Sequence, residues 1–218
     1  IDLKTNGNWD EMDVMHVQAG DGDEDFARLN WIVPSAHTAT IGGGATYETI
    51  DGFKGNGVNA YLNLEYEPAE FRGDTTDISF GFFVKNFTGS TDCPMGCFDG
   101  SNGCHWIHFI FGGTPQDAIR LKSDLQFKNP AQTIDGLYNV KRLATTTVNA
   151  YVNGGIWFNN AISNTSLPTI KVAALARHRG GDTYDYYSNT NVLFTFQGTR
   201  DADKNNLTST ITNYINAL

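Results

Sequence analysis

The segment TIDGFKGNGVNAYLNLEYEP, residues 49–68, begins as a turn and continues as a strand. Its first half contains Gly52, Gly55, Asn56 and Gly57. Glycine and asparagine tolerate the positive φ angles that a sharp reversal requires. We therefore expect the chain to reverse direction just before the second half of the segment.

In that second half every other residue is apolar, at Ala60, Leu62, Leu64 and Tyr66. Side chains on a strand point alternately to opposite faces. The alternation therefore predicts a strand with one buried face and one face in contact with water.

Further segments have the composition of short strands, at residues 77–86, 106–111, 117–127, 136–142, 147–155, 169–177 and 191–198. Clusters of glycine, asparagine, aspartate and serine separate them, and Asn153-Gly154-Gly155 has the composition of a tight hairpin turn. Many short strands without intervening helices favour an antiparallel two-sheet sandwich over alternating β–α units.

Helical spacing occurs only at the end of the chain. Leu207, Ile211 and Ile215 recur on one side of an amphipathic helix that Thr199 or Asp201 can cap. The predicted fold class is therefore all-β, an antiparallel two-sheet jelly-roll sandwich with one C-terminal α-helix.

The charge balance of the chain indicates which classes of partner to expect. The chain has 218 residues, with 15 Lys and Arg against 24 Asp and Glu and a formal net charge of -9. Nucleic acid is not expected as a partner, because neutralising phosphates dominates that affinity. No apolar run approaches the roughly 20 residues that cross a bilayer, so we expect no membrane insertion.

The order of several pieces resembles the concanavalin A-like, or laminin G-like, jelly-roll domain of bacteriophage tail and virion structural proteins. The pieces are residues 29–41, the glycine-rich turn and strand at 46–68, and the segments 77–84, 97–103, 149–155, 166–181 and 191–218. The resemblance covers residues 29–218 and implies one jelly-roll domain there. Residues 1–28 depart from it and are predicted to be an N-terminal arm or docking segment.

The resemblance also implies a function: a non-enzymatic virion module of the tail or particle surface that contributes to attachment to host-surface glycans. Expected partners are other virion proteins and further copies of the chain within the particle, and no cofactor is expected. A purely structural capsid decoration or tail-assembly subunit is one alternative. A polysaccharide-degrading glycoside hydrolase is another.

The best candidate for ligand binding is the stretch RHRGGDTYDYYSNTN, residues 177–191. Aromatic rings stack on the apolar faces of sugars, while polar side chains supply directional hydrogen bonds. The predicted ligand-binding residues are Arg177, His178, Arg179, Asp182, Tyr184, Tyr186 and Tyr187. The alternative is a tyrosine-rich loop folded onto the edge of the sandwich. Trp157 and Phe158 leave the same choice open, with core packing favoured.

Catalysis would require two carboxylates that face one glycosidic bond. Glu65 and Glu67 are in phase on the predicted strand, but Pro68 ends the strand and Glu70 is out of register. A solvated strand end accounts for these acids, and we assign no catalytic residue.

All three cysteines lie in one stretch, at Cys93, Cys97 and Cys104, followed by His105 and His108. Thiolates and imidazoles at close spacing are ligands that Zn²⁺ prefers. This spacing matches no common zinc motif, and on a strand the two histidines would point to opposite faces. A turn with thiols, or one local disulfide, is the alternative.

Two acidic stretches begin like calcium loops. One contains Asp201, Asp203 and Asn205, and the other is residues 20–26. Both lack the closing ligand of such a loop, and helix capping accounts better for the first. We assign no metal site.

Overall fold

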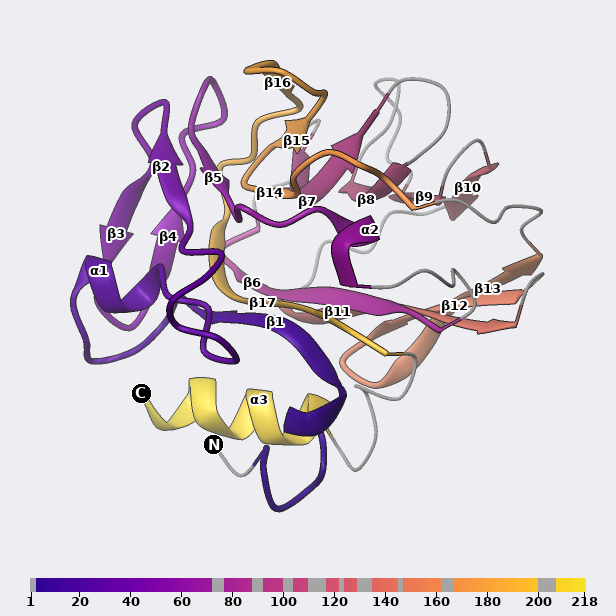
Figure 1. Ribbon diagram of the computed structural model, residues 1–218, viewed down its shortest axis with the longest axis horizontal. Helices are drawn as coiled ribbons and strands as arrows, with labels where there is room; N and C mark the ends of the chain where they lie inside the picture. Colours follow the sequence, from indigo (N-terminus) through magenta and orange to yellow (C-terminus); the bar gives the residue numbers. More distant parts are fainter. Residues whose placement is uncertain are drawn as a thin grey trace.

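The computed structural model describes residues 3–71, 77–87, 92–99, 104–109, 117–121, 124–128, 135–144, 147–161, 167–199 and 207–218. It confirms the predicted class: two β-sheets form a sandwich, and helix α3 (Leu207–Ala217) covers the outer side of one of them (Figure 1). Among the described strands the pairs are antiparallel, except that β15 runs parallel to β7. None of the described helices has the length and apolar character needed to cross a membrane.

Sheet A has 8 strands, in the order β13-β12-β11-β6-β17-β4-β3 with β1 also paired to β17. Its strands are β1 (Met12–Val17), β3 (Thr46–Glu48), β4 (Gly52–Lys54), β6 (Ser79–Lys85), β11 (Gly136–Ala144), β12 (Thr147–Val152), β13 (Gly155–Ala161) and β17 (Asn191–Gly198). The predicted strands at 77–86, 136–142, 147–155 and 191–198 coincide with β6, β11, β12 and β17.

Sheet B has 9 strands, in the order β10-β9-β8-β7-β14-β5-β2, with β15 and β16 attached beside β7. Its strands are β2 (Thr40–Gly42), β5 (Tyr61–Asn63), β7 (Asp92–Phe98), β8 (Cys104–Phe109), β9 (Asp117–Leu121), β10 (Asp124–Lys128), β14 (Ala173–Ala174), β15 (Arg177–His178) and β16 (Tyr184–Asp185). Short helical turns are η1 (Trp9–Glu11), α1 (Glu24–Ala27) and α2 (Pro68–Phe71).

Two features differ from the sequence-based expectation. The predicted strand at 117–127 is a pair of strands, β9 and β10, and the one at 169–177 is reduced to the two-residue strands β14 and β15. Within the segment 1–28, predicted as an arm or docking segment, strand β1 pairs with β17 of sheet A.

The main core lies between the two sheets. The predicted apolar face of the opening strand is buried there: Ala60, Leu62 and Leu64 are 0% exposed. Leu62 and Leu64 belong to one cluster with side chains of sheet A, including Phe53, Phe80, Phe82 and Tyr138. Each fully buried side chain of this size contributes about 1.5–3 kcal/mol to folding.

A second core lies between the outer face of sheet A and helix α3. Leu207, Ile211 and Ile215 are buried in it, as the helical spacing predicts, together with Phe194 and Phe196 of β17. Of the two predicted caps, Thr199 instead donates its hydroxyl to Glu11 Oε2 at 2.7 Å. Asp201 lies outside the described residues.

The glycine-rich turn that precedes β5 is held by one side chain. Asn56 Oδ1 accepts hydrogen bonds from the backbone N–H groups of residues 58, 59 and 60, at 2.9, 3.0 and 3.0 Å. Gly57 has a φ of 69°. A Cβ on Gly55 would lie 2.0 Å from the carbonyl oxygen of Ser188. The turn therefore fixes β5 against the predicted binding loop, which contains Ser188.

Candidate functional site

The predicted binding stretch forms β15, β16 and their connections at the outer side of sheet B, on the opposite side of the sandwich from α3 (Figure 1). Arg177 and His178 of β15 pair with Asp185 and Tyr184 of β16. This short hairpin lies beside β7. The structure therefore brings the predicted residues together in one compact unit.

Arg177 links the two strands of the hairpin through its guanidinium group. Its Nε and Nη2 donate to Asp185 Oδ1 and Oδ2 at 2.8 and 2.7 Å, a two-point contact that fixes both side chains. The guanidinium also lies over the ring of Tyr186, 4.3 Å from its centroid. Burial opposes the charge of Arg177, but the hydrogen bonds and the charge of Asp185 outweigh it, so the pKa of Arg177 is raised.

His178 is the second anchor. Its Nδ1 lies 2.8 Å from the carbonyl oxygen of Lys171, and its Nε2 lies 2.7 Å from that of Gly181. Both partners are acceptors, so a doubly protonated ring donates to both carbonyls and a neutral ring to only one. The side chain thus ties the loop after β15 to the strand region before β14.

The ring of His178 is one of three stacked rings. The rings of Tyr61 and Tyr184 are 3.7 Å apart with an interplanar angle of 12°, and Tyr184 and His178 are 4.7 Å apart at 16°. The Tyr61 ring also lies close to Gly42, where a Cβ would lie 2.1 Å from the tyrosine Cζ. Since Tyr184 stacks with both Tyr61 and His178, it presents its ring edge and hydroxyl to a ligand.

The hydroxyls of Tyr184 and Tyr187 remain protonated at neutral pH. Burial, and after it the neighbouring Tyr61 and Glu65, raise the pKa of Tyr184 to about 12. Burial also raises the pKa of Tyr187, whose hydroxyl donates to the carbonyl oxygen of Tyr184 at 2.9 Å.

The remaining predicted residues face solvent. Arg179 and Asp182 are exposed, and Tyr186 and Tyr187 are partly exposed. Arg179 Nη1 lies 3.5 Å from Asp185 Oδ2, so its guanidinium is only loosely held. We call the following six residues the rim surface: Tyr61, Arg179, Asp182, Tyr184, Tyr186 and Tyr187.

All residues of the rim surface except Tyr61 are among the predicted ligand-binding residues, and their role stays a prediction. Arg177 and His178 are buried supports, whereas they were predicted to contact ligand. Tyr61 was assigned only to the solvent-facing side of its strand. Trp157 is 5% exposed in the main core, in edge contact with Tyr138, which confirms the core-packing alternative. The side chain of Phe158 lies outside the described part of the chain.

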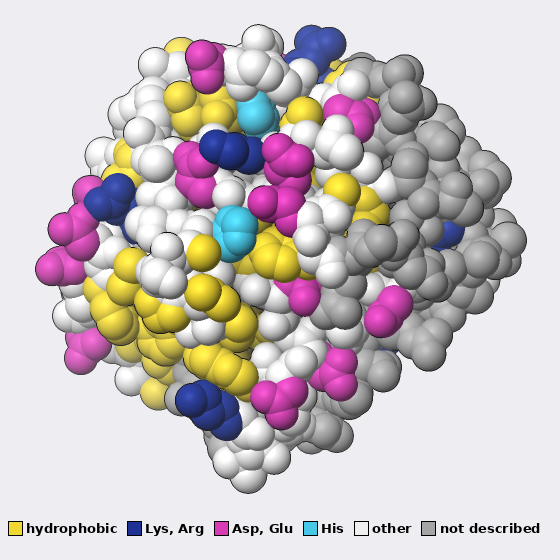
Figure 2. Space-filling model, in the orientation of Figure 1, with side chains coloured by type: hydrophobic (Ala, Val, Ile, Leu, Met, Phe, Trp, Pro, Cys, Tyr) yellow, Lys and Arg dark blue, Asp and Glu magenta, His cyan; other side chains and the backbone are white. Residues whose placement is uncertain are grey.

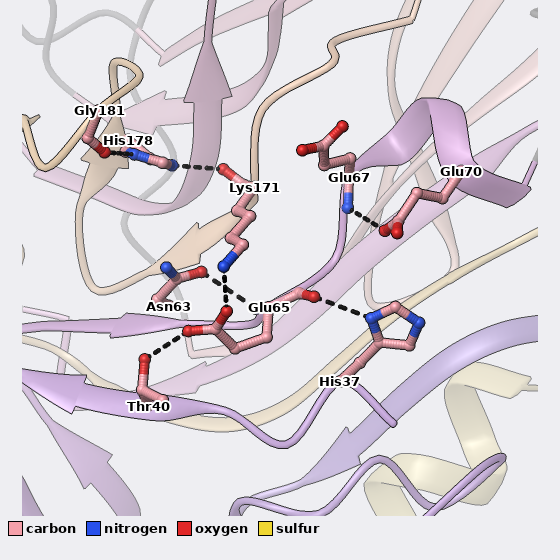
Figure 3. A network of polar contacts seen from close by, with 9 residues as sticks. All are labelled: His37, Thr40, Asn63, Glu65, Glu67, Glu70, Lys171, His178 and Gly181. Atoms are coloured by element: carbon pink, nitrogen blue, oxygen red, sulfur yellow. Dashed lines mark hydrogen bonds and ion pairs between the residues drawn. The ribbon is translucent and has the colours of Figure 1, made fainter. Parts of the chain in front are cut away.

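A polar network adjoins the rim surface (Figure 3). Glu65 Oε1 accepts from the Thr40 hydroxyl at 2.6 Å, and Oε2 forms an ion pair with Lys171. The hydrogen bond with Glu65 raises the pKa of Lys171, against the opposing effect of burial. The Nδ1 atom of His37 lies 2.8 Å from the carbonyl oxygen of Glu65. Both carboxylate oxygens of Glu65 are therefore engaged within the protein.

The other acids of this stretch do not converge on Glu65. Strand β5 ends at Asn63, and Glu65 has a φ of 59°, so the alternation on which a paired-acid site depends stops there. Glu70 Oε2 accepts from the backbone N–H of Glu67 at 2.7 Å. In Figure 3 the carboxylate of Glu67 points away from that of Glu70.

Figure 2 shows acidic, basic and histidine side chains gathered on this side of the molecule, above a hydrophobic area.

The sequence also offered possible metal ligands. Cys93 and Cys97 are buried on β7, and the Cys93 thiol donates to the Met95 carbonyl oxygen at 3.4 Å. The side chains of Cys104, His105 and His108 lie outside what the structure describes. Among the described residues, no three His, Cys, Asp or Glu side chains form a group that could hold a metal ion.

The structure describes one of the two acidic stretches, residues 20–26. In residues 20–26, Asp23 Oδ1 accepts from the Phe26 N–H at 2.9 Å and caps α1, while Asp25 pairs with Arg28. This stretch therefore uses two of its carboxylates within the fold. The first stretch, at residues 201–205, lies outside the described residues.

No known protein family matches the sequence, and no curated protein matches it. Among solved structures, a chain of botulinum neurotoxin type C has a TM-score of 0.59 and 13% identity, over 98% of this chain and 53% of that one. Its cell entry depends upon interaction with two ganglioside molecules. The receptor-binding domain of botulinum neurotoxin D has a TM-score of 0.56 and 9% identity, over 96% and 53%.

A third similar structure is domain 4 of AbnA, a GH43 extracellular arabinanase from Geobacillus stearothermophilus, in complex with arabinotriose. It has a TM-score of 0.48 and 17% identity, over 74% of this chain and 83% of that one, and we base no conclusion about this chain on it. This chain spans about half the length of the botulinum neurotoxin chains, at 53%. At these identities the likeness shows the jelly-roll-like sandwich fold alone.

Proposed function

We propose that the protein is a non-enzymatic, glycan-binding sandwich domain and that the rim surface contacts the glycan. The observation that carries this proposal is the double anchoring of the loop. Arg177 holds Asp185 at two points, and His178 lies between two carbonyl oxygens, so the exposed residues between them are set in place before a ligand arrives.

Preorganisation matters because a shallow glycan site gains little from each contact. Immobilising one flexible side chain on binding costs about 0.5–1.5 kcal/mol. Tyrosines add large contact area with only two side-chain torsions each. Arg179 and Asp182 add a donor group and an acceptor group beside them, which suits the hydroxyls of a sugar.

The comparison supports the class of ligand but not the residues. The botulinum neurotoxin type C chain has a similar fold, and ganglioside interaction is part of its cell entry. Its 13% identity to this chain transfers no site, so the rim surface is argued from the geometry of this chain.

The setting we propose is a bacteriophage particle, with the domain in the tail or on the surface, contributing to attachment to the host. This part rests on the sequence resemblance described above. Other virion proteins and further copies of the chain are the proposed partners. Mass spectrometry of purified particles tests it: the chain is expected among the virion proteins, and its absence from intact particles refutes the setting while leaving glycan binding open.

The proposal that the domain is non-enzymatic has its own test. Glu65 is committed to Lys171 and Thr40, so it is poorly placed to give a proton to a glycosidic oxygen. Purified protein is therefore expected to leave polysaccharides uncleaved. Hydrolysis that disappears in Glu65→Gln or Glu67→Gln would establish the hydrolase alternative instead.

A glycan array tests binding at the rim surface. Wild-type protein is expected to bind one class of glycan, and Tyr186→Ala and Tyr187→Ala each to weaken that binding at least tenfold. Lys54→Ala changes an exposed side chain on β4 of the other sheet and serves as the matched control. Absence of any glycan binding would favour the purely structural alternative. Binding that survives both tyrosine substitutions would contradict the rim surface as the binding site.

A further inference from the structure

The described part of the structure contains a second concave region, between α3 and the outer side of sheet A. Its volume is about 930 Å³, which lies in the range of sites for small ligands. One wall comes from α3, the other comes from β12 and its turn toward β13, and β6 and the start of β11 contribute Phe83, Lys85, Asp135 and Gly136. The two charged groups have opposite signs and contacts of their own: Lys85 Nζ lies 3.9 Å from Asp51 Oδ1, and Asp135 Oδ1 accepts from the Phe87 N–H at 3.3 Å. This groove lies on a different sheet from the rim surface, on the opposite side of the sandwich (Figure 1).

The wall contributed by α3 is polar but uncharged. Ser209, Thr212, Asn213 and Asn216 line the groove. Their spacing places them on one side of the helix, which is distinct from the buried stripe of Leu207, Ile211 and Ile215. The chain has 39 charged residues, 15 basic and 24 acidic, yet residues 207–218 contain none.

This composition is unusual for the exposed side of a helix. Serine, threonine and asparagine are weaker helix formers than glutamate, lysine or arginine, which exposed helix positions normally favour. The fold therefore gains nothing locally from this choice. A row of hydroxyls and amides without charge instead offers both donors and acceptors to a neutral ligand rich in hydroxyl groups.

The opposite wall supplies an aromatic ring and a fixed turn. Tyr151 is partly exposed on β12, and its hydroxyl accepts from Asn149 Nδ2 at 3.0 Å, which leaves its own proton to donate. Asn153 Oδ1 accepts from the Leu137 N–H at 2.9 Å, and its Nδ2 donates to the carbonyl oxygen of Asp135 at 3.2 Å. The amide of Asn153 thus rigidifies the wall and is not available to a ligand.

From this arrangement we propose that the groove binds a neutral saccharide, with Tyr151 as the ring contact and Thr212, Asn213 and Asn216 as hydrogen-bonding groups. The combination of one aromatic ring with hydroxyl and amide side chains matches the apolar faces and hydroxyls of a pyranose. The inference goes beyond the proposed function, because it adds a second site that shares no residue with the rim surface.

The test is NMR titration of isotope-labelled protein with a panel of neutral sugars: methyl glucoside, methyl galactoside, methyl mannoside, N-acetylglucosamine, maltotriose and cellotriose. At least one sugar is expected to shift the side-chain amide signals of Asn213 and Asn216 in a saturable manner. The double variant Asn213→Ala/Asn216→Ala is expected to weaken that sugar at least fivefold. Because alanine is the better helix former, this variant should fold as well as wild type.

A rim variant serves as the matched control. Arg179→Ala is expected to leave the affinity of the groove unchanged, so failure at one site is distinguishable from failure at the other. Two results overturn the groove proposal: a panel in which no sugar moves the signals of Asn213 and Asn216, or a sugar whose affinity is the same in the double variant.

Discussion

The buried histidine His16 makes the stability of this domain depend on pH. His16 of β1 is 1% exposed, and its Nε2 lies 2.8 Å from the carbonyl oxygen of His37, to which it donates. Its Nδ1 is buried and has no hydrogen-bond partner among the residues that the structure describes. Burial lowers the pKa of His16 from 6.5 to about 4, partly opposed by the hydrogen bond to His37. The folded protein therefore keeps this ring neutral.

The sign and size of the effect follow from the two pKa values. Below pH 6.5 the unfolded chain takes up a proton on His16, whereas the folded chain does so only near pH 4. Stability is thus fully present above pH 6.5 and is lost as the pH falls toward 4. One pKa unit corresponds to about 1.4 kcal/mol, so the loss is about 3 kcal/mol in all.

The assay compares wild type with His16→Gln by urea unfolding between pH 7.5 and pH 4. Glutamine keeps an N–H donor for the His37 carbonyl oxygen but does not titrate. Other groups titrate alike in both proteins, so the difference in unfolding free energy isolates His16. Wild type is expected to lose about 3 kcal/mol relative to the variant across this range. Parallel stability curves would refute the reasoning.

Five further substitutions, two matched pairs and one single change, test the fold and the anchors by urea unfolding. Gly43→Ala is expected to cost about 2–4 kcal/mol, because the new Cβ would lie 1.5 Å from a backbone oxygen at a φ of 61°. Gly181→Ala, with a φ of 56° and open space around it, should cost only about 1 kcal/mol. Arg177→Ala is expected to cost about 2 kcal/mol, since it strands a partly buried carboxylate, against less than about 0.5 kcal/mol for the exposed Arg179→Ala. Ile211→Ala should cost about 2–5 kcal/mol, because it opens a cavity under α3. Equal effects within either pair, or an unchanged midpoint for Ile211→Ala, would contradict the packing described.

The fold class could be predicted because residues 60–66 alternate between apolar and polar and because turn residues separate the other short segments of strand-like composition. Strand β1 (Met12–Val17) could not be predicted in this way. Its residues Met12, Val14, Met15 and Val17 are all buried, because sheet A has a core on each side. A strand buried on both faces has no alternating pattern to recognise. Strands β6 and β17 are also buried along their length, but they are rich in the phenylalanine and valine that favour strands, whereas β1 includes Asp13 and His16.

The rim surface could be predicted in part from composition, since tyrosine, arginine and aspartate cluster in one loop. The roles of Arg177 and His178 could not, because they depend on the hairpin that pairs β15 with β16 and on a carbonyl oxygen contributed by Lys171. The groove could not be predicted from the sequence for a similar reason. Tyr151 and Asn213 line one groove only because α3 packs on sheet A.

The central claim is that the rim surface is the glycan-binding site, and amide chemical-shift mapping with a glycan identified on the array tests it most directly. The account predicts that the largest shifts fall on Tyr61 and on residues 179–187, with saturation at one affinity. Shifts confined to the groove or to the network around Glu65 would contradict it. The absence of shifts on Tyr61 and on residues 179–187 would contradict it as well.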